Sequence, residues 1–323
     1  MTYKPCKNIQ RTLTVFFLLC GFLIVFNFMT SSKLYKIYSL NNFEPQIDET
    51  LPKKLNFKSG SAFENLALKI DSIKNDTCGN STLVLSITLS HTSEAEMRHF
   101  IRNSWGSKDV YFRTRLRPIF LVGATNNNSL QNEIENEAKT FRDILQINYM
   151  DTYRNLTYKI MAGLSWISEN CRITPWILKI DHDVMLNPFN LRKFLEKELQ
   201  SNPSQNVIIG NCKKNATKPF RFGKWGVSQK EYPGTFYPVY TWGPAYIISR
   251  NSVDKLLIAS NETPFLSLED IFITGILAKK AKVQLKNIDW RHFVSLFFYT
   301  ERIFVVQANQ TEQKLHWEKN SEA

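Results

Sequence analysis

The sequence predicts an α/β domain with a mainly parallel sheet that is flanked by helices. Short apolar runs rich in β-branched residues recur through the chain and are typical of buried strands. They alternate with segments of about ten to fifteen residues whose pattern favours helices, which is typical of parallel strands joined by crossover helices. Hydrophobic residues make up 43% of the 323 residues, enough for a sizeable core.

The elements follow one another in a regular order until about residue 200. The expected strands cover residues 82–90, 117–125, 144–151, 176–181, 207–212 and 245–249. The expected helices cover residues 92–106, 130–145, 156–171, 187–199, 253–260 and 269–280. The first helix has typical end signals: Thr92 and Ser93 are good N-caps, acidic residues follow them, and basic residues end the segment.

The N-terminal region carries one long apolar run. Residues 12–32 contain no charged residue and are long enough for a bilayer span, which needs about 20 apolar residues. A cleaved signal peptide is the rival interpretation, but its apolar core is only about 7–15 residues long and ends at an A-x-A-like site. We therefore favour an uncleaved signal-anchor. Lys4, Lys7 and Arg11 precede the run, which favours a cytosolic N-terminus.

This topology divides the chain into four expected parts. They are a cytosolic tail (1–11), a transmembrane signal-anchor (12–32), a lumenal stem (33–80) and one catalytic-sized domain (81–323). The stem is rich in Asn, Lys, Ser and Pro, and within it FENLALKI (63–70) is expected to form a short amphipathic helix. We therefore expect a single-pass type II membrane protein with a lumenal domain.

Sequons and cysteines agree with a secretory location. Candidate N-glycosylation sites begin at Asn75, Asn80, Asn127, Asn155, Asn215, Asn261 and Asn309. Some of these must occur by chance in an Asn-rich chain. Cys78, Cys171 and Cys212 lie in the expected lumenal part and allow at most one internal disulfide, but the sequence does not choose the pair.

The formal net charge of +12 suits a membrane surface, a nucleic acid or a phosphate-bearing small substrate. No RNP, zinc-finger or helix-turn-helix pattern accompanies this charge, so we do not expect a nucleic-acid partner. Many of the basic residues are expected to form a solvated surface.

Two aspartates follow the strand expected at 176–181. Ligands of open α/β sheets bind beyond the carboxyl ends of the strands, and residues i and i+2 of an extended chain point to the same side. Asp181 and Asp183 would therefore present two carboxylates to one site, with His182 pointing away. Two hard oxygen ligands suit Mg²⁺ or Mn²⁺. A lone D-x-D is usually a capping or turn feature, but its position after a buried strand favours a functional role.

Six segments, in order along the chain, resemble the β-1,3-galactosyltransferase family, which also includes β-1,3-N-acetylglucosaminyltransferases and Fringe-like relatives. They are MRHFIRNSWG, IFLVG, RDILQINYMDTYRNLTYKIMAGLSWISENC, LKIDHDVMLN, KWGVSQKEYPGTFYPVYTWGPAYIIS and PFLSLEDIFITGILAKK. The resemblance runs from about Thr82 to Trp317. It is far more specific than any single motif.

The resemblance implies a GT-A-type glycosyltransferase domain, with a Rossmann-like sheet, in the Golgi membrane. It implies an inverting reaction in which a carboxylate removes the proton of an acceptor hydroxyl while the hydroxyl oxygen displaces UDP. The implied donor is UDP-galactose or UDP-N-acetylglucosamine, and the implied cofactor is Mn²⁺ or Mg²⁺. The implied acceptor is a glycan of a glycoprotein or glycolipid, modified in β-1,3 linkage. The oligomeric state is not predicted.

The resemblance also implies roles for the residues that match the family motifs. Asp270 is the expected catalytic base, with Glu269 as the alternative; without the family, Asp270 would be taken as an acid at a helix N-terminus. The expected metal ligands are Asp181 and Asp183. The expected nucleotide-sugar contacts are Arg98, Arg102, Lys159, Lys179 and Asp181. The two arginines lie four residues apart on one helical face, and a pair of surface cations is the other interpretation.

Two positions depart from the family pattern. Gln307 stands where a histidine usually completes the metal site, and its carbonyl would give a looser site for a hard cation. Ala245 replaces a more usual glycine and is expected to narrow the acceptor side. Gln307 keeps a second hypothesis open, a catalytically degenerate membrane protein that binds glycans or UDP-sugar. A third is an interaction protein with this fold and no nucleotide site.

Overall fold

The computed structural model describes residues 53–54, 56–201, 206–213, 217–293, 303–305 and 310–321. The expected membrane span at 12–32 lies outside the described residues, as do Asn215, Gln307 and Asn309. In the described part of the chain, no helix combines the length and apolar character needed to cross a bilayer. The described residues fall into two compact units: an α/β domain within 45–218 and 235–323, and the segment Pro219–Gly234.

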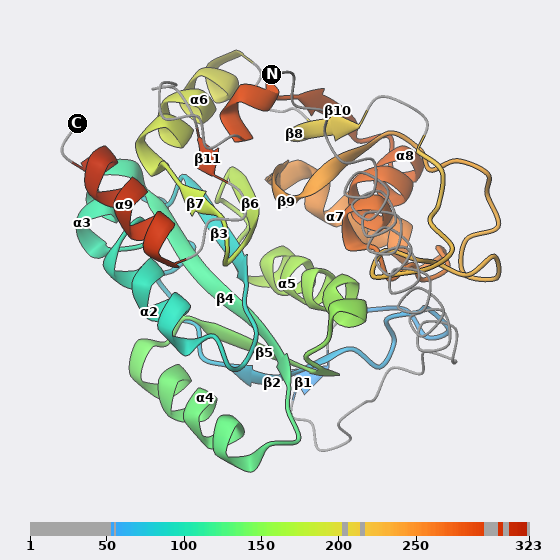
Figure 1. Cartoon of the computed structure of the whole chain (residues 1–323), viewed down its shortest axis with the longest axis horizontal. Helices are drawn as coiled ribbons and strands as arrows, with labels where there is room; N and C mark the ends of the chain where they lie inside the picture. The colour runs from blue at the N-terminus through green and yellow to red at the C-terminus, as the bar shows by residue number, and fades with distance from the viewer. Residues whose placement is uncertain are drawn as a thin grey trace, which may run out of the picture. The chain divides into compact units, whose positions relative to one another are not determined.

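Nine of the described strands form one mixed sheet in the α/β domain, in the order β1-β2-β5-β4-β3-β6-β9-β8-β10 (Figure 1). Their bounds are β1 (Lys53–Lys54), β2 (Ala67–Asp71), β3 (Val84–Leu89), β4 (Leu116–Ala124), β5 (Ile144–Met150), β6 (Trp176–Asp181), β8 (Val207–Lys213), β9 (Tyr240–Ser249) and β10 (Gln284–Asn287). Strands β5, β4, β3 and β6 are parallel, and β10 is parallel to β8. The remaining pairs are antiparallel. The expected parallel arrangement is therefore confirmed for the four central strands, whereas β2 and β9 join them by antiparallel pairs.

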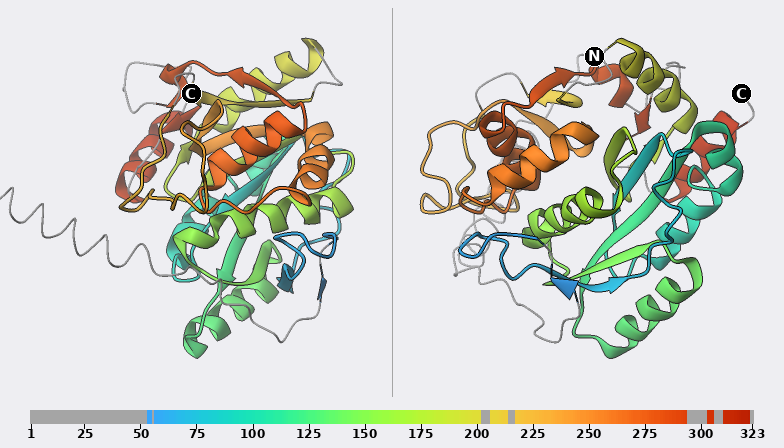
Figure 2. Two further views of the ribbon diagram at one scale, coloured as in Figure 1. Left: turned by 90° about the vertical axis from the view of Figure 1, so that its right-hand side faces the viewer. Right: turned by 180° about the vertical axis from the view of Figure 1, so that it is seen from behind.

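Helices cover both faces of this sheet (Figures 1 and 2). One face carries α2 (Ala95–Asn103), α3 (Lys108–Thr114), α4 (Asn128–Phe141) and α6 (Pro188–Ser201), and the other carries α5 (Leu156–Asn170), α7 (Arg250–Ser260) and α8 (Ala278–Lys280). Gly163 lets α5 cross close to β4, because a Cβ at this position would lie 2.7 Å from Leu121 Cδ1. A short pair, β7 (Met185–Leu186) with β11 (Phe304–Val305), and helix α9 (Gln310–Ser321) complete the domain.

The main apolar core lies on the α2 side of the sheet. Leu178 and Ile180 of β6 pack there with Ile101 of α2 and Leu191 of α6. The alternation of a strand therefore sends Lys179 of β6 to the opposite face. Trp105 is fully buried in this core, as expected for a packing residue.

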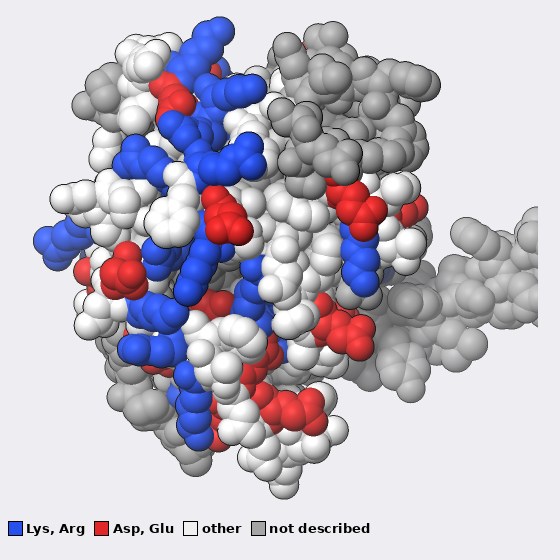
Figure 3. Space-filling view, turned by 90° about the vertical axis from the view of Figure 1, so that its left-hand side faces the viewer, with Lys and Arg blue, Asp and Glu red and all other residues white. Residues whose placement is uncertain are grey.

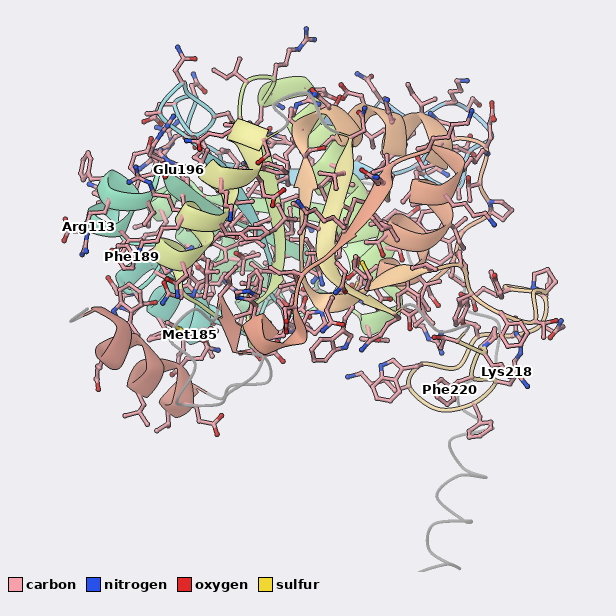
Figure 4. All side chains as sticks on the ribbon, turned by 90° about the horizontal axis from the view of Figure 1, so that it is seen from above. Arg113, Met185, Phe189, Glu196, Lys218 and Phe220 are labelled. Carbon is pink, nitrogen blue, oxygen red and sulfur yellow. A yellow bond between two sulfur atoms is a disulfide. The ribbon has the colours of Figure 1, made fainter. Side chains whose placement is uncertain are left out.

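A cation–π contact joins the short helix α3 to α6. The guanidinium carbon of Arg113 lies 4.3 Å from the ring centroid of Phe189 (Figure 4). On the face that carries α2, α3 and α9, basic side chains outnumber acidic ones (Figure 3). Lys108 and Arg113 of α3 are exposed there. These residues match the solvated basic surface expected from the composition.

The folded domain begins before residue 81, so the expected stem at 33–80 is too long. Phe63 and Leu66 are fully buried, and β2 pairs antiparallel with β5. The helix expected at 63–70 is wrong, because the edge of β5 offers this segment backbone hydrogen bonds and its apolar residues a buried face. A disulfide between Cys78 and Cys171 also ties this region to the end of α5, which settles the pairing that the sequence left open.

Candidate active site

A buried lysine organises the polar residues at the carboxyl end of β6. Lys179 Nζ lies 2.7 Å from Asp181 Oδ1 and 2.8 Å from Glu269 Oε1. It also donates a hydrogen bond of 2.5 Å to the carbonyl oxygen of Gly243. The hydroxyl of Tyr246 donates to Glu269 Oε2 at 2.9 Å. We call Lys179, Asp181, Glu269 and Tyr246 the lysine cluster.

Strand register explains why these residues meet. Lys179 of β6 pairs directly with Tyr246 of the antiparallel strand β9, so both side chains lie on the α5 side of the sheet. Glu269 comes from the segment before the π-helix η2 (Ile271–Leu277). A π-helix is rare and is frequently found at functional sites. The cluster therefore joins three segments that are distant in the sequence.

The ammonium group of Lys179 forms ion pairs with two carboxylates of the lysine cluster. Burial lowers the pKa of Lys179, but the neighbouring carboxylates of Asp181 and Glu269 raise it by more. The net pKa of Lys179 is therefore raised, and its ammonium group stays protonated. Burial raises the pKa of Glu269, and Lys179 only partly opposes this shift. The pKa of Asp181 is raised in the same way, although 33% of its side chain is exposed. The site therefore has an excess of negative charge and attracts a cation.

Asp270 provides the partly exposed carboxylate next to this cluster. Its Oδ1 accepts a hydrogen bond of 2.8 Å from the backbone N–H of Ile271. No described residue donates a hydrogen bond to Oδ2. Burial and the neighbouring Glu269 carboxylate raise the pKa of Asp270 to about 7. A carboxylate with a pKa near the working pH is suited to act as a general base.

Glu269 is the weaker of the two candidate bases. It is buried, and both of its oxygens are occupied, one by Lys179 and the other by Tyr246. An oxygen held in this way is not available to take a proton from a substrate. The geometry therefore favours Asp270 as base and gives Glu269 a role in holding Lys179.

Asp181 and Asp183 have oxygens that fit a hard cation. Lys179 occupies only Oδ1 of Asp181, and Asp183 is half-buried with no hydrogen bond to a described residue. Within the described ranges no three His, Cys, Asp or Glu residues are grouped so that they could hold a metal. Mg²⁺ and Mn²⁺ accept such incomplete protein sites, because water and substrate phosphate oxygens supply the other ligands. The two aspartates therefore fit the expected ion.

The turn that carries these aspartates is held from two sides. The backbone N–H of His182 donates to the Leu89 carbonyl at 3.1 Å, and its Nδ1 lies 3.2 Å from the same oxygen. The side chain of Gln313 in α9 donates to the His182 carbonyl at 3.1 Å. The role of His182 is thus structural. Strand β11, which ends two residues before Gln307, pairs with β7, which begins two residues after Asp183.

A second buried network lies at the carboxyl ends of β3, β4 and β5. Lys159 forms an ion pair with Asp151 and donates to the Ser90 carbonyl at 2.9 Å. Asp151 Oδ2 accepts hydrogen bonds from the backbone N–H groups of Thr92 and Gly123, at 3.1 and 2.9 Å. These contacts join the loops after β3 and β5 to the end of β4. Lys159 therefore has a structural role here, and nucleotide binding by its side chain stays a prediction.

Arg98 is fully buried and only 10% of the Arg102 side chain is exposed, so the interpretation as a surface pair is wrong. Arg98 donates to Ser90 Oγ and to the His91 carbonyl, and it pairs with Glu137 at 2.6 Å. It thus supports the loop after β3, at the same edge of the sheet as Asp181. Contact between Arg98 and a nucleotide stays a prediction.

Arg102 points toward the other edge of the sheet. It forms two hydrogen bonds of 2.8 Å to Asp143, which directly precedes β5, and pairs with Glu137 at 2.8 Å. Its guanidinium lies 4.0 Å from the ring centroid of Phe141. These contacts use the planar side chain as a structural clamp. The geometry does not support the expectation that Arg102 binds a diphosphate.

Two other expectations need correction. The side chain of Asn155 is buried and its amide donates to the Met150 carbonyl at 2.7 Å, so a glycan there does not fit the folded domain. Asn75, Asn80 and Asn127 are exposed and Asn261 is half-buried. Ala245 is fully buried in the core on the α2 side. Its methyl group therefore does not narrow the acceptor side.

The segment Pro219–Gly234 has an internal hydrogen-bond network of its own. The guanidinium of Arg221 donates to four carbonyl oxygens, those of Val227, Ser228, Tyr232 and Gly234, at 2.9–3.3 Å. Exposed aromatic rings lie in the same segment at Phe220, Phe222 and Trp225. The loop thus displays apolar rings from a backbone that is fixed by one arginine.

Sequence reasoning missed several residues that build the site. Gly243 and Tyr246 lie in a segment that resembles the family, but no role was predicted for them, because they act through neighbours that are far away in the chain. No local pattern singled out Gln313. Asp151 did carry a local signal, since it follows a buried strand as Asp181 does.

Comparison with known proteins identifies the family of this chain. The galactosyltransferase family model matches residues 96–289. β-1,3-galactosyltransferase 5 of Gorilla gorilla gorilla is 31% identical over 259 residues, which cover 79% of this chain and 80% of that protein. β-1,3-galactosyltransferase brn of Drosophila melanogaster is 30% identical over 200 residues, which cover 62% of this chain and 61% of that protein. A solved glycosyltransferase involved in glycosylation of the major capsid of PBCV-1 superposes with a TM-score of only 0.38 at 10% identity, covering 73% of this chain and 98% of that one.

That superposition is too weak to carry an argument, whereas the family model spans more than half of the chain. The chain belongs to the galactosyltransferase family and is a galactosyltransferase-like enzyme.

Proposed function

We propose that this enzyme transfers galactose, or alternatively N-acetylglucosamine, from a UDP-sugar to a glycan in β-1,3 linkage with inversion. The observation that carries the proposal is the Asp270 carboxylate, whose Oδ2 is open and whose pKa is about 7. It lies beside the lysine cluster at the carboxyl end of β6, where ligands of open α/β sheets bind. The names of the similar galactosyltransferases support the same reaction class.

Asp270 performs the proton transfer in this proposal. Its Oδ2 takes the proton of an acceptor hydroxyl while the hydroxyl oxygen forms a bond to the anomeric carbon of the donor sugar. The bond between that carbon and the diphosphate oxygen breaks, and UDP leaves with the electron pair. A positioned base typically contributes about 10²–10⁴-fold to the rate.

The lysine cluster positions the donor side. Lys179 fixes Asp181 at the strand end through an ion pair of 2.7 Å. Asp181 and Asp183 would hold Mn²⁺ or Mg²⁺, with Gln307 as a further candidate ligand, and the ion would stabilise the negative charge of departing UDP. Because Lys179 is itself held by Glu269, the donor side and the base are parts of one connected unit.

The proposed location is the Golgi membrane, with a type II topology and a lumenal domain. The expected signal-anchor at 12–32 and the exposed sequons at Asn75, Asn80 and Asn127 support this location. The disulfide between Cys78 and Cys171 is consistent with an oxidising compartment.

A donor screen with the purified full chain tests the proposal. UDP-galactose and UDP-N-acetylglucosamine are each supplied with and without Mn²⁺ and a panel of glycan acceptors, and transfer and UDP release are measured. We expect Mn²⁺-dependent transfer that is lost in Asp183→Ala but kept in Asp109→Ala, which alters an exposed aspartate of α3. Full activity of Asp183→Ala would exclude its metal role. UDP binding without any transfer would favour the degenerate alternative.

A further inference from the structure

Gly243 of β9 lies directly against the carboxylate of Asp270. A Cβ atom at Gly243 would lie 3.2 Å from Asp270 Oδ2 and 3.4 Å from its Cγ. The first of these distances is shorter than an ordinary van der Waals contact between carbon and its neighbours. Because Gly243 has no Cβ, its side-chain position does not crowd Oδ2, the oxygen of Asp270 to which no described residue donates a hydrogen bond.

The backbone at Gly243 does not itself require glycine. Positive φ values among the described residues occur at Gly60, Gly223, Arg115, Arg142 and Lys282. Gly243 is not one of them, so alanine can adopt its backbone conformation. What this glycine contributes is the missing side chain, not conformational freedom.

The two segments around this space are tied together on both sides. The Gly243 carbonyl accepts a hydrogen bond from Lys179. The backbone N–H of Thr241 donates to Thr274 Oγ1 at 2.9 Å, and that hydroxyl donates to the Asp270 carbonyl at 2.5 Å. Strand β9 and helix η2 are thus held at a fixed separation. A methyl group at Gly243 would therefore press on the Asp270 carboxylate, which would have to move by a few tenths of an ångström, rather than push the segments apart.

We propose that Gly243 determines which nucleophile reaches Asp270. The space that it leaves beside Oδ2 admits a secondary hydroxyl of a pyranose ring, whose carbon carries ring neighbours on both sides. A water molecule is much smaller than a pyranose ring and therefore needs less of this space to reach Oδ2. This inference rests on the proposed function: Asp270 Oδ2 takes the hydroxyl proton, the hydroxyl oxygen bonds to the anomeric carbon, and UDP leaves with the electrons of the broken bond.

The variant Gly243→Ala tests this role through a ratio of two activities. Transfer to a glycan acceptor and hydrolysis of the UDP-sugar by water are measured on the same full-chain preparation, together with the melting temperature. We expect the ratio of transfer to hydrolysis to fall roughly 10–100-fold, since small displacements of reacting groups cost about that much. In Gly243→Ala, transfer to a primary alcohol acceptor should fall less than transfer to a secondary alcohol acceptor.

Gly79→Ala is the matched control, because a Cβ there meets only the Asp76 carbonyl oxygen at 3.4 Å. An unchanged ratio in Gly243→Ala, or an equal loss of transfer and hydrolysis, would overturn the role of Gly243 while leaving the proposed function intact. Absence of both activities in the unmodified enzyme with every donor would overturn the proposed function, and this inference with it. If Gly243→Ala does not fold, transfer by the unmodified enzyme to primary and secondary alcohol acceptors is compared with hydrolysis, and failure of every secondary alcohol to compete with water would overturn the role of Gly243.

Discussion

The ammonium group of Lys179 lies 2.8 Å from the carboxylate of Glu269. This contact connects the end of β6, which carries the expected donor site, with the segment that carries the expected base. Both side chains are buried, and breaking a buried ion pair by removing one partner leaves an uncompensated charge. The pair is therefore a structural requirement of the site as well as a part of its electrostatics.

Replacing Lys179 by methionine should destabilise the enzyme by about 3–5 kcal/mol at neutral pH, because Glu269 and Asp181 would lose their shared cation. The loss in free energy of unfolding should be smaller at about pH 5, because unpaired buried carboxyls take up protons there and lose their charge. Urea unfolding at the two pH values measures this difference. Lys197→Met, an exposed lysine of α6, is the control.

Restoring charge balance should restore stability. The double variant Lys179→Met/Glu269→Gln should recover part of the lost free energy, because glutamine can still accept the Tyr246 hydrogen bond. A double variant less stable than Lys179→Met alone would contradict the role assigned to this pair.

The pH profile of transfer should report Asp270. Since burial raises its pKa to about 7, kcat/KM should rise about tenfold per pH unit below pH 7 and level off above it. The folded pKa exceeds the unfolded value, so this carboxyl favours the folded state most when protonated. Its contribution is present below about pH 4 and is lost as the pH rises to about 7.

The variant Asp270→Asn supplies the control for that profile. Transfer should fall by about 10²–10⁴-fold, while affinity for UDP, measured by calorimetry, should change little. The residual activity should no longer rise toward pH 7. An Asp270→Asn enzyme with full activity would remove Asp270 from the mechanism.

Arg102→Met should lower stability without lowering affinity for UDP. Its charged hydrogen bonds join α2 to Glu137 and Asp143, and such bonds contribute about 1.5–3 kcal/mol each to stability. Chemical unfolding and calorimetry with UDP measure the two quantities. A tenfold loss of UDP affinity in a stably folded Arg102→Met enzyme would restore the nucleotide role predicted from its sequence position.

The disulfide between Cys78 and Cys171 should stabilise the domain by about 2–5 kcal/mol, mainly by restricting the unfolded chain. Cys171→Ser, or treatment with a reductant, should lower the melting temperature. Cys212→Ser is the control, since Cys212 is not part of this bridge. Peptide mapping that finds a bridge to Cys212 instead would contradict the pairing.

Ala245→Gly, which restores the residue more usual in the family, should leave acceptor preference unchanged. The Ala245 methyl group is buried in the core on the α2 side, so its removal should cost about 1 kcal/mol in stability. Acceptor profiling and thermal unfolding separate the two effects. A changed acceptor preference for Ala245→Gly would show that its side chain influences the site.

Local periodicity was sufficient for most of the central fold. The strand expected at residues 176–181 coincides with β6 (Trp176–Asp181), and the aspartates at its end could be assigned from that strand alone. The same reasoning predicted a helix at 63–70, because the apolar pattern of this segment also suits a short helix. Only the open edge of β5 makes it a strand.

Residues close together in the chain were enough to predict the alternation of strands and helices, the family and the aspartates at the end of β6. The contacts between distant groups, such as Lys179 with Glu269, Gly243 with Asp270 and Arg102 with Asp143, became visible only in the folded domain. Such contacts depend on the register between β6 and β9 and on how α2 packs against the sheet. A one-residue change of register would send each side chain to the opposite face, and for that reason the partner of a buried charge was not predictable from local sequence.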